Sequence, residues 1–211
     1  MSKYGRWTGV LVGVWLALAL VAGARGVFQN NAQRVGVAVA IAAGSPIVLF
    51  LLWFAASAGF RAFTLSLNPR VLTAMQTWRI IGFVFLLLEA HQQLPAMFAL
   101  PAGYGDMFIG VTASLVAWQL AARYRGAFIA WQLLGILDLV VAVGSGTLSR
   151  VLDPNGISML PMTMLPLSLV PTFLVPLFLI FHVICIAQAR QWKGSVVEER
   201  GSARAVGYRA V

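Results

Sequence analysis

Charged side chains are scarce in this chain. Only 10% of its 211 residues are Asp, Glu, Lys or Arg, whereas 60% are hydrophobic and the mean hydropathy is +0.87. A soluble domain could not bury that much apolar surface, but a lipid bilayer solvates it. The composition excludes an ordinary soluble enzyme and predicts an all-α, polytopic transmembrane helical bundle.

Cysteine and histidine are almost absent. The single cysteine, Cys185, excludes an intramolecular disulfide and a cysteine-based zinc motif. No nucleophile elbow, P-loop or dinucleotide-binding glycine pattern is present. The sequence therefore favours a protein that is not an enzyme, and it predicts no cofactor. Two alternatives stay open: a mixed nitrogen and oxygen metal site, with the metal unknown, and a haem between His91 and His182.

Six apolar runs are long enough to cross a bilayer, which takes roughly 20 residues per helix. The expected spans are about 7–24, 35–59, 80–100, 106–122, 127–148 and 164–188. They form one transmembrane domain over residues 1–188. The remaining residues, 189–211, are expected to be a basic, disordered cytoplasmic tail.

The net charge of +9 is distributed unevenly along the chain. Only Arg25, Arg34 and Arg150 fall in the expected outer loops, and the other basic residues fall in inner segments. This positive-inside pattern predicts that both termini of the six-span bundle lie in the cytoplasm. The basic inner loops and tail are expected to contact anionic lipid, and no nucleic-acid partner is predicted.

The first apolar run has a second interpretation. Lys3 and Arg6 precede it, and Ala22-Gly23-Ala24 resembles the small-residue site of a cleaved signal peptide. Cleavage of residues 1–24 would leave five spans with the N-terminus outside.

A polar cluster interrupts the third expected span. Glu89, His91, Gln92 and Gln93 lie between hydrocarbon residues on both sides. Within a span of residues 80–100, Glu89 and His91 would lie roughly 14–17 Å from the inner end, near the middle of the bilayer. Polar groups at that depth persist mainly when they face protein, water or a ligand, so this cluster is the first candidate site.

Two further residues complete the expected polar site. Asp138 would lie at a similar depth in the fifth span, and His182 would lie somewhat nearer the inner face in the sixth. An ionised carboxylate is costly there, which makes Glu89 and Asp138 candidates for proton binding. The alternative is that these groups only tie helices together.

Three other features carry expectations. Asp106 follows an expected tight outer turn at residues 101–105 and is predicted to cap the next helix or to form an outer gate. Arg79 is expected at the inner face, against lipid phosphate. The prolines of the last span predict a kinked or broken helix, and they are Pro166, Pro171 and Pro176.

Two stretches of the chain have a familiar pattern. The run from Leu94 to Asp106, and Pro171-Thr172-Phe173-Leu174-Val175-Pro176 with His182, resemble uncharacterised small bacterial multi-span inner-membrane proteins. The resemblance implies residence in a bacterial cytoplasmic (inner) membrane, and it brings no activity or site residue.

The leading hypothesis from the sequence is a small-molecule or ion transporter with a mid-membrane polar site. Because no soluble ATPase domain is evident, pumping would use a gradient or a separate partner. One alternative is a structural or assembly subunit, in a homo-oligomer or a larger membrane complex. The other is a membrane redox or metal-binding protein.

Overall fold

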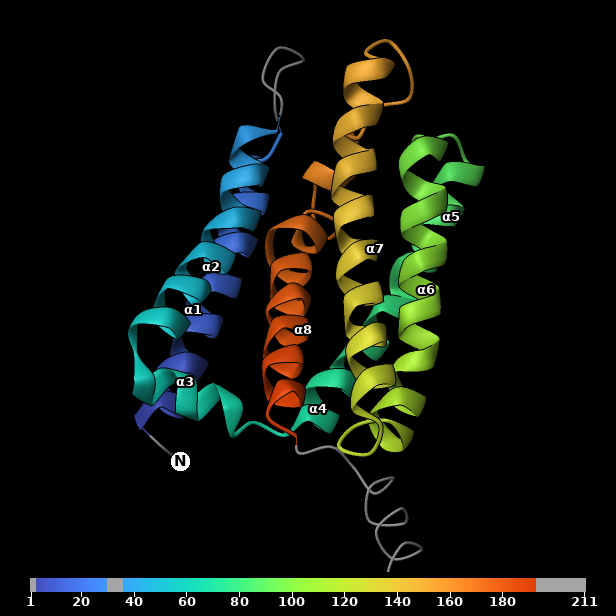
Figure 1. Cartoon of the computed structure of the whole chain (residues 1–211). Coiled ribbons are helices and arrows are strands. Elements are labelled where there is room, and N and C mark those ends of the chain that lie inside the picture. The colour runs from blue at the N-terminus through green and yellow to red at the C-terminus, as the bar shows by residue number, and fades with distance from the viewer. Residues whose placement is uncertain (1–2, 30–35, 193–211) are drawn as a thin grey trace, which may run out of the picture.

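The computed structural model in Figure 1 describes residues 3–29 and 36–192, and within these ranges it is helical and contains no strand. The elements are α1 (Lys3–Ala24), α2 (Val37–Ala56), α3 (Ala58–Leu65), α4 (Pro69–Ala74), η1 (Met75–Gly82), α5 (Phe83–Ala90), α6 (Ala96–Gln119), α7 (Arg125–Leu152), η2 (Leu160–Thr163), η3 (Val170–Leu174) and α8 (Val175–Arg190). The predicted basic tail comprises residues 189–211, and from position 193 onward it lies outside the described residues.

Five helical segments are long and apolar enough to cross a membrane. They are Lys3–Ala24, Val37–Ala56, Pro69–Ala90, Arg125–Leu152 and Val170–Arg190. Helix α6 has 24 residues, which is also a spanning length, but it is less apolar and contains Asp106. The all-helical prediction is confirmed, and the structure supports five of the spans by length and composition.

The third membrane-length segment is shifted relative to the prediction. It begins at Pro69, where the Asn68 side chain accepts a hydrogen bond from the Arg70 amide at 2.9 Å, and it runs through α4, η1 and α5. The expected continuous span of residues 80–100 is wrong, because the helix ends at Ala90 and a turn follows. The earlier start moves Arg79 from the membrane surface to the middle of the segment.

The fourth segment begins earlier than predicted. The expected tight turn at residues 101–105 is wrong, because these residues lie inside α6. The true turn is at residues 91–95, where Gln92 has a positive φ of 56° and Pro95 precedes the first residue of α6. Asp106 therefore lies inside the helix, so its predicted role as an N-cap is also wrong.

The last segment changes its helical form along its length. Pro166 lies in the turn between η2 and η3, Pro171 lies in η3, which is a π-helix, and Pro176 lies in the first turn of α8. Because η3 and α8 are continuous over Val170–Arg190, Pro176 removes one helical hydrogen bond at the point where the π-helix changes to α-helix.

Helix α8 lies between the α1–α2 pair and the α6–α7 pair (Figure 1). Two apolar clusters fill the interior. One contains Phe128 of α7 and Val116 of α6, and the other contains Ala142 of α7 and Phe98 of α6. Along both helices the segment between the two clusters carries an aspartate, so the polar site lies between two apolar layers.

Candidate functional site: a buried arginine with two aspartates

The residues of the predicted polar cluster lie at the end of α5 and in the turn after it. Glu89 is half-buried, and His91, Gln92 and Gln93 are exposed. The His91 ring pairs through Nδ1 with the carbonyl oxygen of Leu87 at 2.8 Å, which is a contact within its own turn. The prediction that this cluster lies at mid-span is wrong, because the helix starts eleven positions before residue 80 and ends at Ala90.

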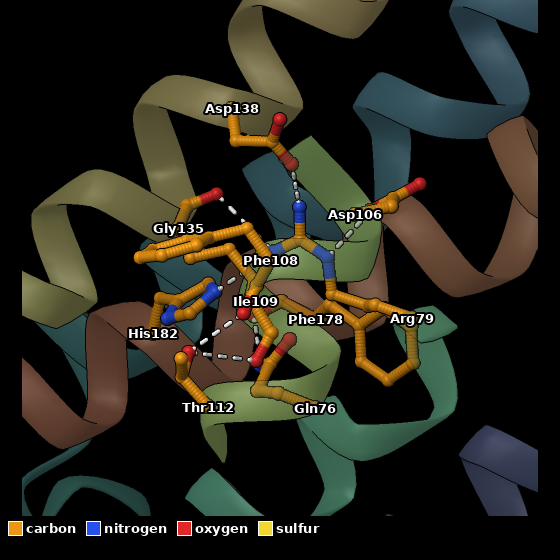
Figure 2. Close-up of polar contacts among 10 residues, drawn as sticks. All are labelled: Gln76, Arg79, Asp106, Phe108, Ile109, Thr112, Gly135, Asp138, Phe178 and His182. Atoms are coloured by element: carbon orange, nitrogen blue, oxygen red, sulfur yellow. Dashed lines mark hydrogen bonds and ion pairs between the residues drawn. The ribbon is translucent and has the colours of Figure 1, made fainter. Parts of the chain in front are cut away.

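Arg79 takes the central position instead. Its side chain is almost fully buried, with 3% of the residue exposed, and each guanidinium nitrogen has a partner. Nε donates to Asp106 at 2.6 Å, Nη2 donates to Asp138, and Nη1 lies 3.3 Å from both the Gly135 carbonyl oxygen and His182 Nε2. Figure 2 shows the two carboxylates approaching the guanidinium from different sides. The predicted contact of Arg79 with lipid phosphate is therefore wrong.

The hydrogen bonds around His182 define its tautomer. Gln132 donates through its amide nitrogen to the Thr73 hydroxyl at 3.1 Å, and its amide oxygen faces His182 Nδ1. That oxygen can only accept, so Nδ1 carries the proton. Nε2 then has the lone pair and accepts from Arg79. His182 is thus a neutral acceptor on the arginine, as well as being fully buried.

Glycines allow the helices of the site to approach closely. A Cβ at Gly105 of α6 would overlap the Asp138 carboxylate, and a Cβ at Gly135 of α7 would overlap the His182 ring. Any larger residue at either position would displace a partner of Arg79. The small-residue positions on α6 and α7 are therefore part of the site geometry.

The charges of the site do not balance. One guanidinium and two carboxylates leave a net charge of −1 when all three are ionised, because His182 is neutral. Each carboxylate uses one oxygen for Arg79, and within the described residues no hydrogen bond to the other oxygen is found. The arrangement can accept a proton or a cationic group without losing its contacts to Arg79.

A cavity of about 240 Å³ reaches the site from one side. Asp106 lines it, Arg150 lies at the far end of its α7 wall, and the remaining lining is mainly apolar. Arg79 and Asp138 do not line this cavity. An entering molecule would meet the Asp106 carboxylate and would be separated from the guanidinium.

The structure does not join the residues of the proposed metal and haem sites. His91 lies in the turn after α5, whereas both nitrogens of the buried His182 are engaged by Gln132 and Arg79. Over residues 3–29 and 36–192, no group of three or more His, Cys, Asp or Glu side chains is arranged to hold a metal ion.

Two members of the site, Arg79 and Gln132, were not predicted from the sequence. The signal for Arg79 was Asn68-Pro69, which is typical of a helix start as well as of a turn. A helix that begins there places Arg79 at mid-span, where it needs a carboxylate partner. Gln132 had no comparable signal, since it is a single amide among apolar residues.

The structure thus defines a helical protein with membrane-length apolar helices and a buried ionic site at their centre. The family described as Domain of unknown function (DUF8737) matches residues 35–190, and the chain belongs to this family. The match covers every residue of the ionic site and begins after α1. No curated protein and no solved structure matches the chain.

Proposed function

We propose that the protein is a permease of the bacterial inner membrane that moves a small solute or ion through the site formed by Arg79, Asp106 and Asp138. The observation that carries the proposal is the unequal pairing of one buried guanidinium with two carboxylates, one of which lines a cavity. A purely structural ion pair needs one carboxylate for each guanidinium, and buried charge without a counter-charge is costly. The second carboxylate supports a role in binding.

Six spans with both termini inside suit this proposal. With α6 counted as a span, one end of the bundle holds the start of α1, α3, α4, the start of α7 and the end of α8 (Figure 1). These segments and the turn before α7 carry most of the basic residues outside the ionic site, and these are Lys3, Arg6, Arg61, Arg70, Arg123, Arg125 and Arg190. Arg25 and Arg150 lie near the other end. The asymmetry supports an inner face at the first end, with anionic lipid headgroups around it.

The shared guanidinium suggests how binding is coupled to movement. Arg79 lies between α6, which carries Asp106, and α7, which carries Asp138. A proton or a cationic solute on Asp106 weakens its attraction to Arg79, while Asp138 keeps the guanidinium paired. Binding in the cavity therefore changes the strength of the contact between α6 and its neighbouring helices. A solute gate needs such a change on binding.

Solute-jump currents on a solid-supported membrane test this function directly. Proteoliposomes would be exposed in turn to small organic cations, organic anions and zwitterions. We expect a current with at least one class, and we expect Asp106→Asn and Asp138→Asn to abolish it. Folded wild-type protein that gives no current with any class would contradict the permease proposal.

The assembly-subunit hypothesis stays the second candidate, favoured by one observation on α1. A Cβ built at Gly9 or Gly13 would meet no described atom within 4 Å, so this closely spaced pair of small residues has no neighbour among residues 3–29 and 36–192. Gentle extraction followed by native mass spectrometry separates the two candidates. A stoichiometric hetero-complex would favour assembly, whereas a monomer or homo-oligomer would favour the permease.

A further inference from the structure

The cavity beside Asp106 extends along α7. Its α7 wall is one helical stripe that starts at Leu139 and ends at Arg150. Eleven residues of α-helix span about 16 Å. On the α2 side the wall is made of small side chains, Ala40 and Ala43 among them. A volume of about 240 Å³ corresponds to about eight water molecules, which suits a ligand of roughly ten non-hydrogen atoms.

The inner end of the cavity, which is the buried end at Asp106, has the chemistry of a cation site. Asp106 and Phe85 lie at this end, because Gly82, one turn before Phe85, packs against Asp106. The Phe98 ring, whose centroid lies 5.4 Å from that of Phe85, packs against Gly146 of α7, nearer to Arg150. One Asp106 oxygen binds Arg79, and the other accepts no hydrogen bond from the described part of the chain. A carboxylate with an aromatic ring on the neighbouring wall attracts an alkylammonium group by charge and by the cation–π interaction.

The rest of the lining restricts the ligand further. Between the two ends the walls are mainly apolar, so the body of the ligand should be hydrocarbon. Arg150 at the outer end repels a second positive charge, which disfavours diamines. Arg79 makes no contact with the cavity, so nothing at the inner end attracts an anion.

We infer that the cavity binds an organic monocation, with its ammonium group at Asp106 on the Phe85 side and its apolar body directed past Phe98 toward Arg150. This inference rests on the proposed function and names its solute class. Binding can be measured without transport, so the two claims can fail separately.

The test uses hexyltrimethylammonium as the probe and hexanesulfonate as its anionic counterpart. Isothermal titration is performed on the full chain in lipid nanodiscs, with empty nanodiscs subtracted. We expect saturable binding of the cation and none of the anion. Phe85→Leu should weaken cation binding by about 5- to 30-fold, since it removes a ring face and keeps an apolar side chain.

Matched variants separate the site from general effects on folding. Phe83→Leu changes a lipid-exposed ring on the same helix and should leave the affinity unchanged. Asp106→Asn should abolish binding. Because that change also breaks a buried ion pair, Ala43→Leu provides a second variant that fills the cavity from α2 without touching the ions. It should abolish binding too.

Arg150→Gln decides between a cation and an anion site. It removes the repulsion at the outer end, so cation binding should become no weaker. Saturable hexanesulfonate binding that disappears in Arg150→Gln would overturn the inference and indicate an anionic ligand. Cation uptake that survives both Asp106→Asn and Ala43→Leu would overturn it as well, because it would reflect partition into lipid.

Comparison with the current measurements distinguishes the two proposals. Cation binding without any solute current would leave the binding site standing and contradict the permease. Currents that only anions or zwitterions evoke, with no cation binding, would leave the permease standing and contradict this ligand class.

Discussion

The carboxylate of Asp138 occupies the space that a side chain at Gly105 would fill. Helices α6 and α7 approach closely at this point, and the contact directs Asp138 toward Arg79. The ionic site therefore depends on an absent side chain as much as on its charged residues.

Gly105→Ala should displace Asp138 and destabilise the protein. The added methyl group overlaps the carboxylate, and overpacking of this kind costs about 1–3 kcal/mol. The measurement is the free energy of unfolding in mixed micelles. Gly144→Ala on α7 is the matched control, because a Cβ there meets no atom of the described residues within 4 Å. It should stabilise the helix by up to about 1 kcal/mol. Equal effects of the two changes would contradict the packing described for Gly105.

Replacement of Arg79 should be among the most damaging single changes. Arg79→Met leaves Asp106 and Asp138 buried without a counter-charge, and breaking a buried ion pair costs about 3–5 kcal/mol. The triple variant Arg79→Met, Asp106→Asn, Asp138→Asn removes all three charges and should recover much of that loss. Unfolding free energies of the single and triple variants measure the difference. A triple variant less stable than Arg79→Met would show that unpaired charge is not the cause.

Gln132→Leu should destabilise the protein by about 1–3 kcal/mol, the cost of buried polar groups that lose their partners. His182 Nδ1 and the Thr73 hydroxyl both lose Gln132 in this variant. Gln119→Leu, at the exposed end of α6, is the control and should change the unfolding free energy little. A similar effect of both changes would mean that the Gln132 bonds add no stability.

Gln92→Gly should keep or raise stability. Gln92 has a φ of 56°, in the left-handed region that glycine adopts without steric cost. Its side chain is exposed and makes a 3.4 Å contact within its own turn. The unfolding free energy should therefore stay within about 1 kcal/mol of wild type or increase. Clear destabilisation would contradict the turn at residues 91–95 and would favour an unbroken helix through this region.

Composition and hydropathy predicted the helical class, because lipid-facing side chains dominate the chain. They failed on the register of the third span. Arg70, Gln76 and Arg79 lower the hydropathy where the helix begins, and the apolar residues from Ala96 onward, which belong to α6, extend the apolar run beyond its end. Hydropathy averages over a window and does not resolve a turn that has apolar residues on both sides.

The candidate site was predicted in part. Asp138 and His182 were chosen for their depth, and the structure brings them to one guanidinium. The role of each in function stays a prediction. Their partners could not be found in the same way, because Asp106 and Arg79 were assigned to helix ends. A contact between residues 27 positions apart on different helices depends on packing, which one sequence does not display.

The most direct test compares solute-jump currents of wild type, Asp106→Asn and Glu89→Gln in matched proteoliposomes. Glu89 lies at the end of α5 and Asp106 in the buried ionic site, so the two variants separate the turn from the interior. A functional site at Arg79 predicts currents in wild type and Glu89→Gln and none in Asp106→Asn. Currents that survive in Asp106→Asn and disappear in Glu89→Gln would contradict the account. They would indicate a functional site at the end of α5 and in the turn after it.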